Sequence, residues 1–282
     1  MNKPPSPCSR IPVALTIAGS DSGGGAGIQA DLRAFACFGV FGTSVITAVT
    51  AQNPREVSHV HAVTAESVRK QLRAVLGAFD VGAAKTGMLL SSELIRTVVK
   101  ELEAYPRLRL VVDPVMAASS GAKLLRDDAI RTLCVKLLPR AALITPNLPE
   151  AEILLGRRLR TARAVTGAAS ELARRFGCFV LIKGGHNPAA PGTDFGSDGS
   201  TVWKFHAAPV EKPFTTHGTG CALSAAIAAC LAAGDEPLTA VRNGKAYVLG
   251  LIRNSRTVGG RLFAMWPPPR LPLKDVSVTE EA

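Results

Sequence analysis

The residues with the clearest chemistry lie in the segment Thr216–Cys221, which leads directly into an alanine-rich, helix-favouring run. A glycine-rich turn at a helix start leaves backbone N–H groups unpaired, and the helix dipole adds positive charge there. The turn therefore predicts an anion site at Gly218, Thr219 and Gly220. Cys221 lies in the first turn of the predicted helix, where the pKa of a thiol is lowered. Most free cysteines are small buried hydrophobes, but this position favours a phosphoryl-transfer site with its own proton acceptor.

Charged and polar residues also follow three other strand-like runs. Asp113 ends one run and is held by the proline behind it, while Asn147 and Glu150 follow the next run as the N-cap and capping-box residues of a helix. Alone, this pair would only cap a helix. Together with Asp113, it offers the hard oxygen ligands that Mg²⁺ prefers. Lys183 ends a further strand before two glycines, and although a loop lysine is usually just solvated, the space beside it suits contact with a polyphosphate.

A glycine cluster, Gly19–Gly27, follows the first strand and opens the first helix. Residues 25–30 satisfy a dinucleotide-binding pattern. That site also needs an acidic residue about twenty positions later, and none occurs between Asp31 and Glu56. A Walker A loop is excluded because no Gly-Lys-Ser/Thr sequence occurs. We therefore expect these glycines to let the backbone approach a ligand closely.

Strand-like and helix-like runs alternate along most of the chain. This order predicts an α/β fold with a mostly parallel central sheet and helices on both faces, whose ligands gather at the carboxyl ends of the strands. The expected strands are Ile11–Ala18, Ser44–Thr50, Ala83–Thr86, Leu108–Val112, Leu143–Thr145 and Phe179–Lys183. The expected helices are Ile28–Phe38, Ala65–Phe79, Ser92–Tyr105, Asp127–Leu138, Pro149–Leu155, Ala162–Phe176, Cys221–Ala233 and Leu238–Asn254.

No repeat or linker divides the chain, so we expect a single domain over residues 11–266 between flexible tails at 1–10 and 267–282. The stretch Asn187–Ser200 is rich in Gly, Pro, Ser and Asp and predicts a mobile loop. His59 and His61 share one face of a strand, but no third ligand is near, so a surface strand is favoured over a metal site.

Composition narrows the functional classes. A formal charge of +11 fits phosphate-bearing ligands or nucleic acid, but no nucleic-acid motif or interleaved aromatic residues accompany the arginines. The six cysteines form no Cys-x-x-Cys pair, which favours a reducing cytoplasm. The N-terminus is too polar and proline-rich for a signal peptide, and the apolar run Ala222–Ala233 is too short to cross a bilayer.

In their order, these motifs resemble the hydroxymethylpyrimidine/phosphomethylpyrimidine kinases of thiamine biosynthesis, within the ribokinase-like superfamily. The resemblance spans about residues 11–256, so each motif is modest alone but the ordered set is specific. It is carried by Ala18–Asp21, Gly24–Leu32, Ser44–Ala48, Ala51–Asn53, Lys85, Gly87–Leu89, Asp113–Met116, Thr145–Ala151, Lys183–His186 and Thr216–Cys221.

The resemblance implies a ribokinase-like fold and a role for each matching position. Cys221 is the general base, and a cysteine where most of the superfamily has aspartate marks the pyrimidine branch. Gln52 hydrogen-bonds the aminopyrimidine ring, for which an amide can both donate and accept. Lys183 contacts phosphate beside the glycine turn, and Asp113 and Glu150 lie on the magnesium side. The substrate pocket is lined by Gly19, Ala26, Asp31, Met88 and Val115.

The expected activity is ATP-dependent phosphorylation of 4-amino-5-hydroxymethyl-2-methylpyrimidine and then of its monophosphate. Expected cofactors are ATP and Mg²⁺, with a monovalent cation such as K⁺ as a further candidate. The expected partner is a small-molecule substrate, with no nucleic acid and no membrane, in a homodimer. The alternatives are a pyridoxal/pyridoxine kinase of the same fold, a non-catalytic pyrimidine-binding regulator and a basic nucleic-acid binder. Departures from the family pattern are Gly24, Thr86, Ala222, the 187–200 loop and Gly259–Arg261.

Overall fold

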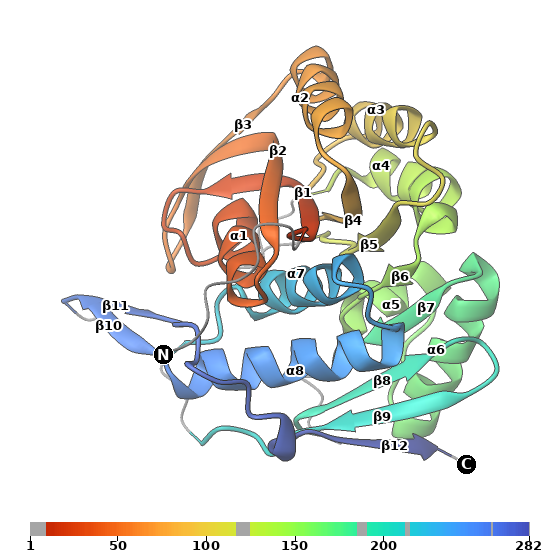
Figure 1. Ribbon diagram of the computed structural model, residues 1–282. Helices are drawn as coiled ribbons and strands as arrows, with labels where there is room; N and C mark the ends of the chain where they lie inside the picture. The colour runs from red at the N-terminus through yellow and green to blue at the C-terminus, as the bar shows by residue number, and fades with distance from the viewer. Residues whose placement is uncertain (1–9, 117–124, 185–190, 212–214, 261, 282) are drawn as a thin grey trace.

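A ten-stranded sheet runs through the molecule, with helices against both faces (Figure 1). The computed structural model describes residues 10–116, 125–184, 191–211, 215–260 and 262–281. Six adjacent strands are parallel, and antiparallel strands extend both edges, in the order β12-β9-β8-β7-β6-β5-β4-β1-β2-β3. The strands are β1 (Val13–Asp21), β2 (Phe41–Gln52), β3 (Val57–Ala62), β4 (Val81–Thr86), β5 (Arg109–Val112), β6 (Leu143–Ile144), β7 (Phe179–Ile182), β8 (Thr193–Ser197), β9 (Val202–His206) and β12 (Ser277–Glu281).

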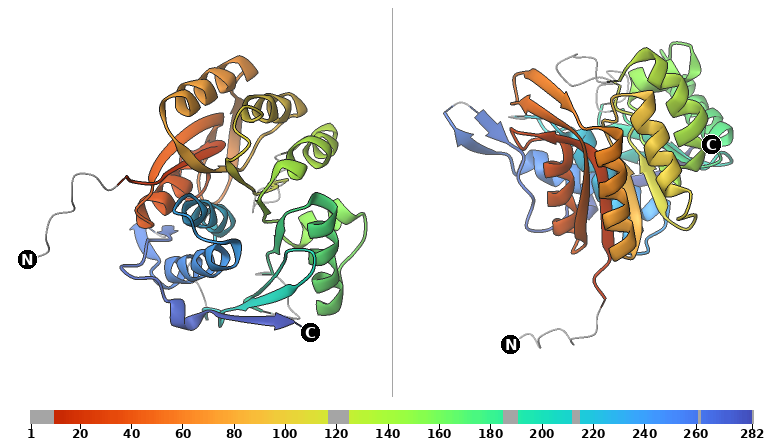
Figure 2. Two further views of the ribbon diagram at one scale, coloured as in Figure 1. Left: turned by 45° about the vertical axis from the view of Figure 1, so that its right-hand side comes forward. Right: turned by 90° about the horizontal axis from the view of Figure 1, so that it is seen from above.

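The two faces of the sheet bury separate hydrophobic cores, and each face is covered by its own set of helices (Figure 2). Successive strand residues point to opposite faces, so Val111 belongs to one core and Val112 to the other. One face packs against α2 (Ala65–Ala78), α3 (Ser92–Leu102), α4 (Asp127–Thr132), α5 (Leu148–Leu155) and α6 (Ala162–Phe176). The other face packs against α1 (Gly27–Cys37), α7 (Thr219–Ala232) and α8 (Pro237–Arg253). The expected α/β class and mostly parallel sheet are confirmed.

Two of the predicted helix boundaries matter for the site. Asn147 caps α5, and Glu150 completes the capping box as expected. Helix α7 is apolar on nearly all sides because it is buried between the sheet and α8. It begins after Gly218, whose φ of +86° is in the left-handed region. A Cβ atom there would lie 1.9 Å from the Gly25 carbonyl oxygen, so the two glycine-rich segments pack backbone to backbone.

Two expected loose segments are instead strands of the sheet. Residues 193–197, expected in a mobile loop, form the buried strand β8 because Asp194 is paired with Lys245 of α8. The C-terminal residues, expected as a flexible tail, include β12, which pairs with β9 along its whole length. Both errors arose because polar strands show no hydrophobic period. A further hairpin joins β10 (Arg256–Gly259) to β11 (Leu262–Ala264).

Three further expectations concern the histidine-bearing strand, the loose segments and membrane-spanning helices. The surface strand at His59 and His61 is confirmed, because both side chains are exposed on β3. The N-terminal tail (residues 1–9), Gly185, His186 and residues 187–190 lie outside the described residues. Within the described ranges, no helix combines the length and the apolar character that a bilayer crossing requires.

Thr86, at the end of β4, holds a buried hydroxyl without a hydrogen-bond partner among the described residues. An unpaired buried polar group destabilises a fold, whereas an apolar group of the same shape does not. We therefore expect Thr86→Val to raise the free energy of unfolding by about 1 kcal/mol, measured by urea denaturation. The matched control is Thr16→Val, whose buried hydroxyl donates to Asp31 at 2.6 Å, so that its loss lowers stability. A less stable Thr86→Val variant would contradict this prediction.

Candidate active site

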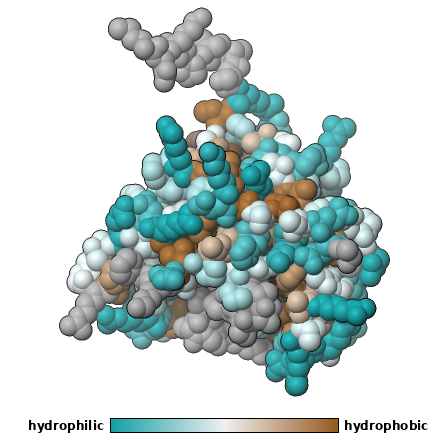
Figure 3. Space-filling model, turned by 90° about the horizontal axis from the view of Figure 1, so that it is seen from below, coloured by the Kyte–Doolittle hydropathy of each residue, from teal (hydrophilic) through white to brown (hydrophobic). Residues whose placement is uncertain are grey.

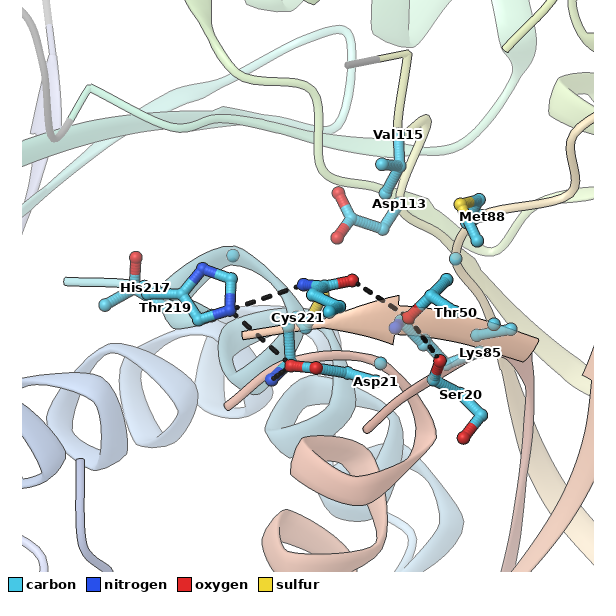
Figure 4. Close-up of a pocket in the computed structure, with 18 of the residues that line it drawn as sticks. Ser20, Asp21, Thr50, Lys85, Met88, Asp113, Val115, His217, Thr219 and Cys221 are labelled. Atoms are coloured by element: carbon cyan, nitrogen blue, oxygen red, sulfur yellow. Dashed lines mark hydrogen bonds and ion pairs between the residues drawn. The ribbon is translucent and has the colours of Figure 1, made fainter. Parts of the chain in front are cut away.

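A cavity of about 160 Å³ opens at the carboxyl ends of the parallel strands, where α7 begins (Figure 4). Strand ends β1, β4, β5 and β7 and the first turns of α5 and α7 all contribute to its wall. This is where the chain topology places ligands in open α/β sheets. The lining residues are Ala18, Gly19, Ser20, Asp21, Ala26, Gly27, Thr50, Gln52, Lys85, Gly87, Met88, Asp113, Val115, Asn147, Glu150, Lys183, His217, Gly218, Thr219, Gly220 and Cys221.

The cavity brings together every predicted site residue except Asp31. Gln52, Gly19, Ala26, Met88 and Val115 line it, as do the residues proposed for phosphate, metal and proton transfer: Cys221, Lys183, Gly218, Thr219, Gly220, Asp113 and Glu150. Asp31 is fully buried behind the wall, where it binds Lys85. The expected pocket position of Asp31 is therefore wrong, because its helix directs the carboxylate into the sheet.

Asp113 is the centre of a polar cluster at one end of the cavity. Its Oδ1 accepts hydrogen bonds from Lys183 Nζ at 2.8 Å and from Thr145 Oγ1 at 3.2 Å. Ser224 Oγ donates to the other carboxylate oxygen at 3.2 Å. Lys183 is only 15% exposed, and although burial opposes its charge, Asp113 and Glu150 raise its pKa. The lysine is therefore a fixed cation at the cavity wall.

Glu150 is the second carboxylate of this cluster. Its side chain accepts the N–H groups of Asn147 at 2.8 Å and Met116 at 3.4 Å. Burial, opposed by Lys183 and helped by the negative charge of Asp113, raises the pKa of Glu150 to about 7. The carboxylate is thus poorly compensated in the absence of a cation.

The donor set fits Mg²⁺. Among the described residues there is no group of three or more His, Cys, Asp or Glu side chains that would form a complete protein cage. Mg²⁺ is usually held by one or two carboxylates together with water and substrate phosphates. Asp113 and Glu150 supply such a pair at the cavity wall.

The raised pKa of Glu150 predicts a pH-dependent stability. A folded-state pKa above the unfolded value means that the folded protein binds the proton more tightly, so stability falls as the pH rises from about 4.5 towards 7. We expect the melting temperature of the ligand-free protein to fall over this range, and the fall to be smaller in Glu150→Gln. Differential scanning calorimetry of both proteins across the range measures the two slopes. Equal slopes would show that Glu150 does not titrate there.

The first turn of α7 places Cys221 beside the glycine turn. The N–H groups of Gly220 and Cys221 have no hydrogen-bond partner among the described residues, as the predicted anion site requires. The thiol differs from expectation: burial raises its pKa, and this effect exceeds the lowering by Lys85 and by the Gly27 N–H. The helix start alone therefore does not produce a lowered thiol pKa.

Sequence reasoning assigned no role to Lys85. Lys85 lines the cavity, but its ammonium is fully buried and donates to both oxygens of Asp31 at 2.8 and 3.0 Å. Although burial opposes the charge, Asp31, Cys221 and Asp113 raise the pKa of Lys85. A single lysine in a strand-like run carried no sequence signal of its own.

A second group, Asp21 and His217, was also missed. Asp21 accepts the N–H groups of Gly23 and Ala26, each at 2.8 Å, and lies 3.5 Å from His217 Nε2. Gln52 Nε2 lies 3.5 Å from the same ring nitrogen. Burial opposes the charge of Asp21, but its hydrogen bonds lower the pKa. The available signal was that Asp21, like Asp113, ends a strand next to a glycine-rich segment.

Known proteins are similar to this chain in sequence and in fold. The family model described as phosphomethylpyrimidine kinase matches residues 21–265. A hydroxymethylpyrimidine/phosphomethylpyrimidine kinase of Rhizobium meliloti is 48% identical over 84% of this chain and 88% of its own length. The structure of a Clostridium difficile phosphomethylpyrimidine kinase is 39% identical, with a TM-score of 0.75 over 85% of this chain and 98% of its own. A Staphylococcus aureus pyridoxal kinase in complex with AMP-PCP and pyridoxal is 32% identical, with a TM-score of 0.83 over 97% and 100% of the two chains.

Proposed function

Because the chain belongs to the phosphomethylpyrimidine kinase family, we propose that its cavity performs that family's phosphoryl transfer. The protein is an ATP-dependent kinase of thiamine biosynthesis that phosphorylates 4-amino-5-hydroxymethyl-2-methylpyrimidine and then its monophosphate. The observation that carries the assignment is the single cavity that joins Gln52, Cys221, Lys183 and Asp113 at the start of α7.

Different side chains bind the pyrimidine ring, accept the proton and hold the phosphates. The Gln52 amide donates a hydrogen bond to a ring nitrogen and accepts one from the exocyclic amine. Cys221 as the thiolate takes the hydroxymethyl proton while the oxygen attacks the γ-phosphorus and ADP leaves. The N–H groups at the start of α7 and Lys183 hold the phosphate oxygens as negative charge shifts between them. Asp113 and Glu150 would hold Mg²⁺, whose charge neutralises the phosphates when it is bound.

A coupled assay tests this function. We expect ADP release with the pyrimidine alcohol, and product mass to show two phosphates added. Pyridoxal is the parallel substrate, because the solved pyridoxal kinase shares the fold over nearly the whole chain. Phosphorylation of pyridoxal alone would make the protein a pyridoxal kinase. Ligand binding without ADP release would instead indicate a regulator, and a salt-sensitive gel shift would indicate a nucleic-acid binder.

Three further properties complete the proposal. Unpaired cysteines in the described part of the chain support a reducing cytoplasm, which fractionation tests. Exposed Phe41 and Phe79 stack at 5.7 Å near one sheet edge and support a homodimer, which light scattering tests. A K⁺ requirement is tested by exchanging K⁺ for Na⁺ in the assay.

A further inference from the structure

The ion pair between Lys85 and Asp31 is buried completely on both sides. Removing two charges from water is unfavourable, and apolar residues of similar volume often stabilise a fold more. A third group, the Thr16 hydroxyl, donates a hydrogen bond to Asp31 Oδ2 at 2.6 Å. Stability alone is therefore a weak reason for an ionic group at this position.

The ammonium of Lys85 has one N–H group beyond the two that pair with Asp31. Asp31 takes two of its N–H groups, and the third has no hydrogen-bond partner within the described ranges. Gly87, which lines the cavity, lies next to this ammonium, because a Cβ atom on Gly87 would lie 3.0 Å from Lys85 Nζ. Lys85 and Cys221 line the same cavity (Figure 4).

We propose that Lys85, held in place by Asp31, is the electrostatic partner that stabilises the thiolate of Cys221 against the effect of burial. This inference rests on the proposed role of Cys221 as proton acceptor. Lys85 acts through the thiol and is in that sense a positioning residue. A fixed cation next to a buried sulfur favours its anionic form, as for other activated cysteines.

The other charges around the thiol do not replace Lys85. Asp31 of α1 and Asp113 after β5 are negative and oppose the thiolate. Lys183 after β7 is another cation that interacts with the thiol, and it is bound directly to Asp113. Lys85 has the largest effect of the charged neighbours. The Gly27 N–H adds a smaller favourable contribution.

Lys85 favours the thiolate of Cys221 and Asp31 opposes it. Removing each charge should therefore change the reactivity of the thiol in opposite directions. In the ligand-free protein, the rate of Cys221 alkylation by iodoacetamide is followed by peptide mass spectrometry from neutral to alkaline pH. We expect Lys85→Met to slow alkylation about tenfold at neutral pH and to shift the profile to higher pH. We expect Asp31→Asn to accelerate it. If the Lys85–Asp31 pair had only a structural role, both substitutions would change the rate of Cys221 alkylation in the same direction.

Two controls accompany the measurement. Exposed Cys37 is an internal reference whose alkylation rate should stay constant in every variant. Lys245→Met also removes one partner of a buried ion pair, at 2.6 Å from Asp194, but lies on α8 and should leave Cys221 unchanged.

Each outcome decides the proposal. Unchanged or faster alkylation in Lys85→Met, or slower alkylation in both Lys85→Met and Asp31→Asn, would overturn it. If Lys85→Met does not fold, the direction of change in Asp31→Asn decides alone. Failure of the wild-type protein to phosphorylate the pyrimidine would overturn the proposed function, whereas the alkylation rates still measure the Lys85–Cys221 coupling.

Among the described residues, one face of the molecule offers no comparable candidate. Viewed from below, it shows mainly hydrophilic residues with scattered hydrophobic ones between them (Figure 3). Scattered apolar residues are normal on protein surfaces.

Discussion

Cys221→Ala is expected to lower kcat by about 10²–10⁴-fold, the usual contribution of a positioned proton acceptor. The KM of the pyrimidine alcohol should change little, because Gln52 and the rest of the ring pocket remain. The substitution shortens one side chain in the first turn of α7 and leaves the N–H groups of the anion site in place. The fall in kcat would therefore reflect a slower chemical step.

Steady-state kinetics with the pyrimidine alcohol and ATP separate kcat from KM in this variant. The matched control is Cys230→Ala, which removes a buried thiol from the same helix away from the cavity. Cys230→Ala should keep its turnover while losing some stability. Wild-type turnover in Cys221→Ala would remove the thiol from the mechanism.

The wild-type enzyme and Cys221→Ala should also differ in how kcat depends on pH. Because burial raises the pKa of Cys221, the thiolate fraction increases as the pH rises from neutral towards that pKa. We expect the kcat of the wild-type enzyme to increase with pH over this range. The alanine variant lacks the thiol, so its residual rate should not show the same increase.

The parts of the site that sequence predicted share one physical cause. Asp113, Glu150 and Lys183 each follow a run of apolar strand residues, and parallel strands end at one edge, so their proximity follows from topology. The turn before α7 was predictable because helix geometry determines where its N–H groups point. These predictions depended on local order along the chain.

The missed and wrong parts depend on pairing between distant elements. Lys85 and Asp31 lie 54 positions apart and meet only when α1 packs against β1, the neighbour of β4 in the sheet. Asp194 and Lys245 likewise make β8 a buried strand through a contact across 51 positions. A polar residue whose partner is far along the chain looks the same in sequence as a solvated one. Asp31 was placed in the pocket by resemblance, and only the packing of α1 shows that it faces Lys85.

Lys183→Met is expected to lower kcat/KM for ATP by about 10²–10³-fold, the usual effect of removing one donor that binds developing charge. In the ligand-free structure Lys183 donates to Asp113 at 2.8 Å. Its position next to the start of α7, where a Cβ atom on Gly220 would lie 3.4 Å from Nζ, places the cation beside the anion site. Methionine keeps an unbranched side chain of similar shape but removes the charge and the N–H donors.

The variant should still bind the pyrimidine alcohol, because Gln52 and the ring pocket are unchanged, and a thermal-shift titration with the alcohol alone measures this. ATP-dependent kinetics then isolate the loss on the nucleotide side. Lys100→Met, on the exposed surface of α3, is the control for removal of one positive charge from a basic protein. Unchanged ATP kinetics in Lys183→Met would mean that the ammonium serves only to neutralise Asp113. In that case the α7 N–H groups and the metal would have to balance the phosphate charge without it.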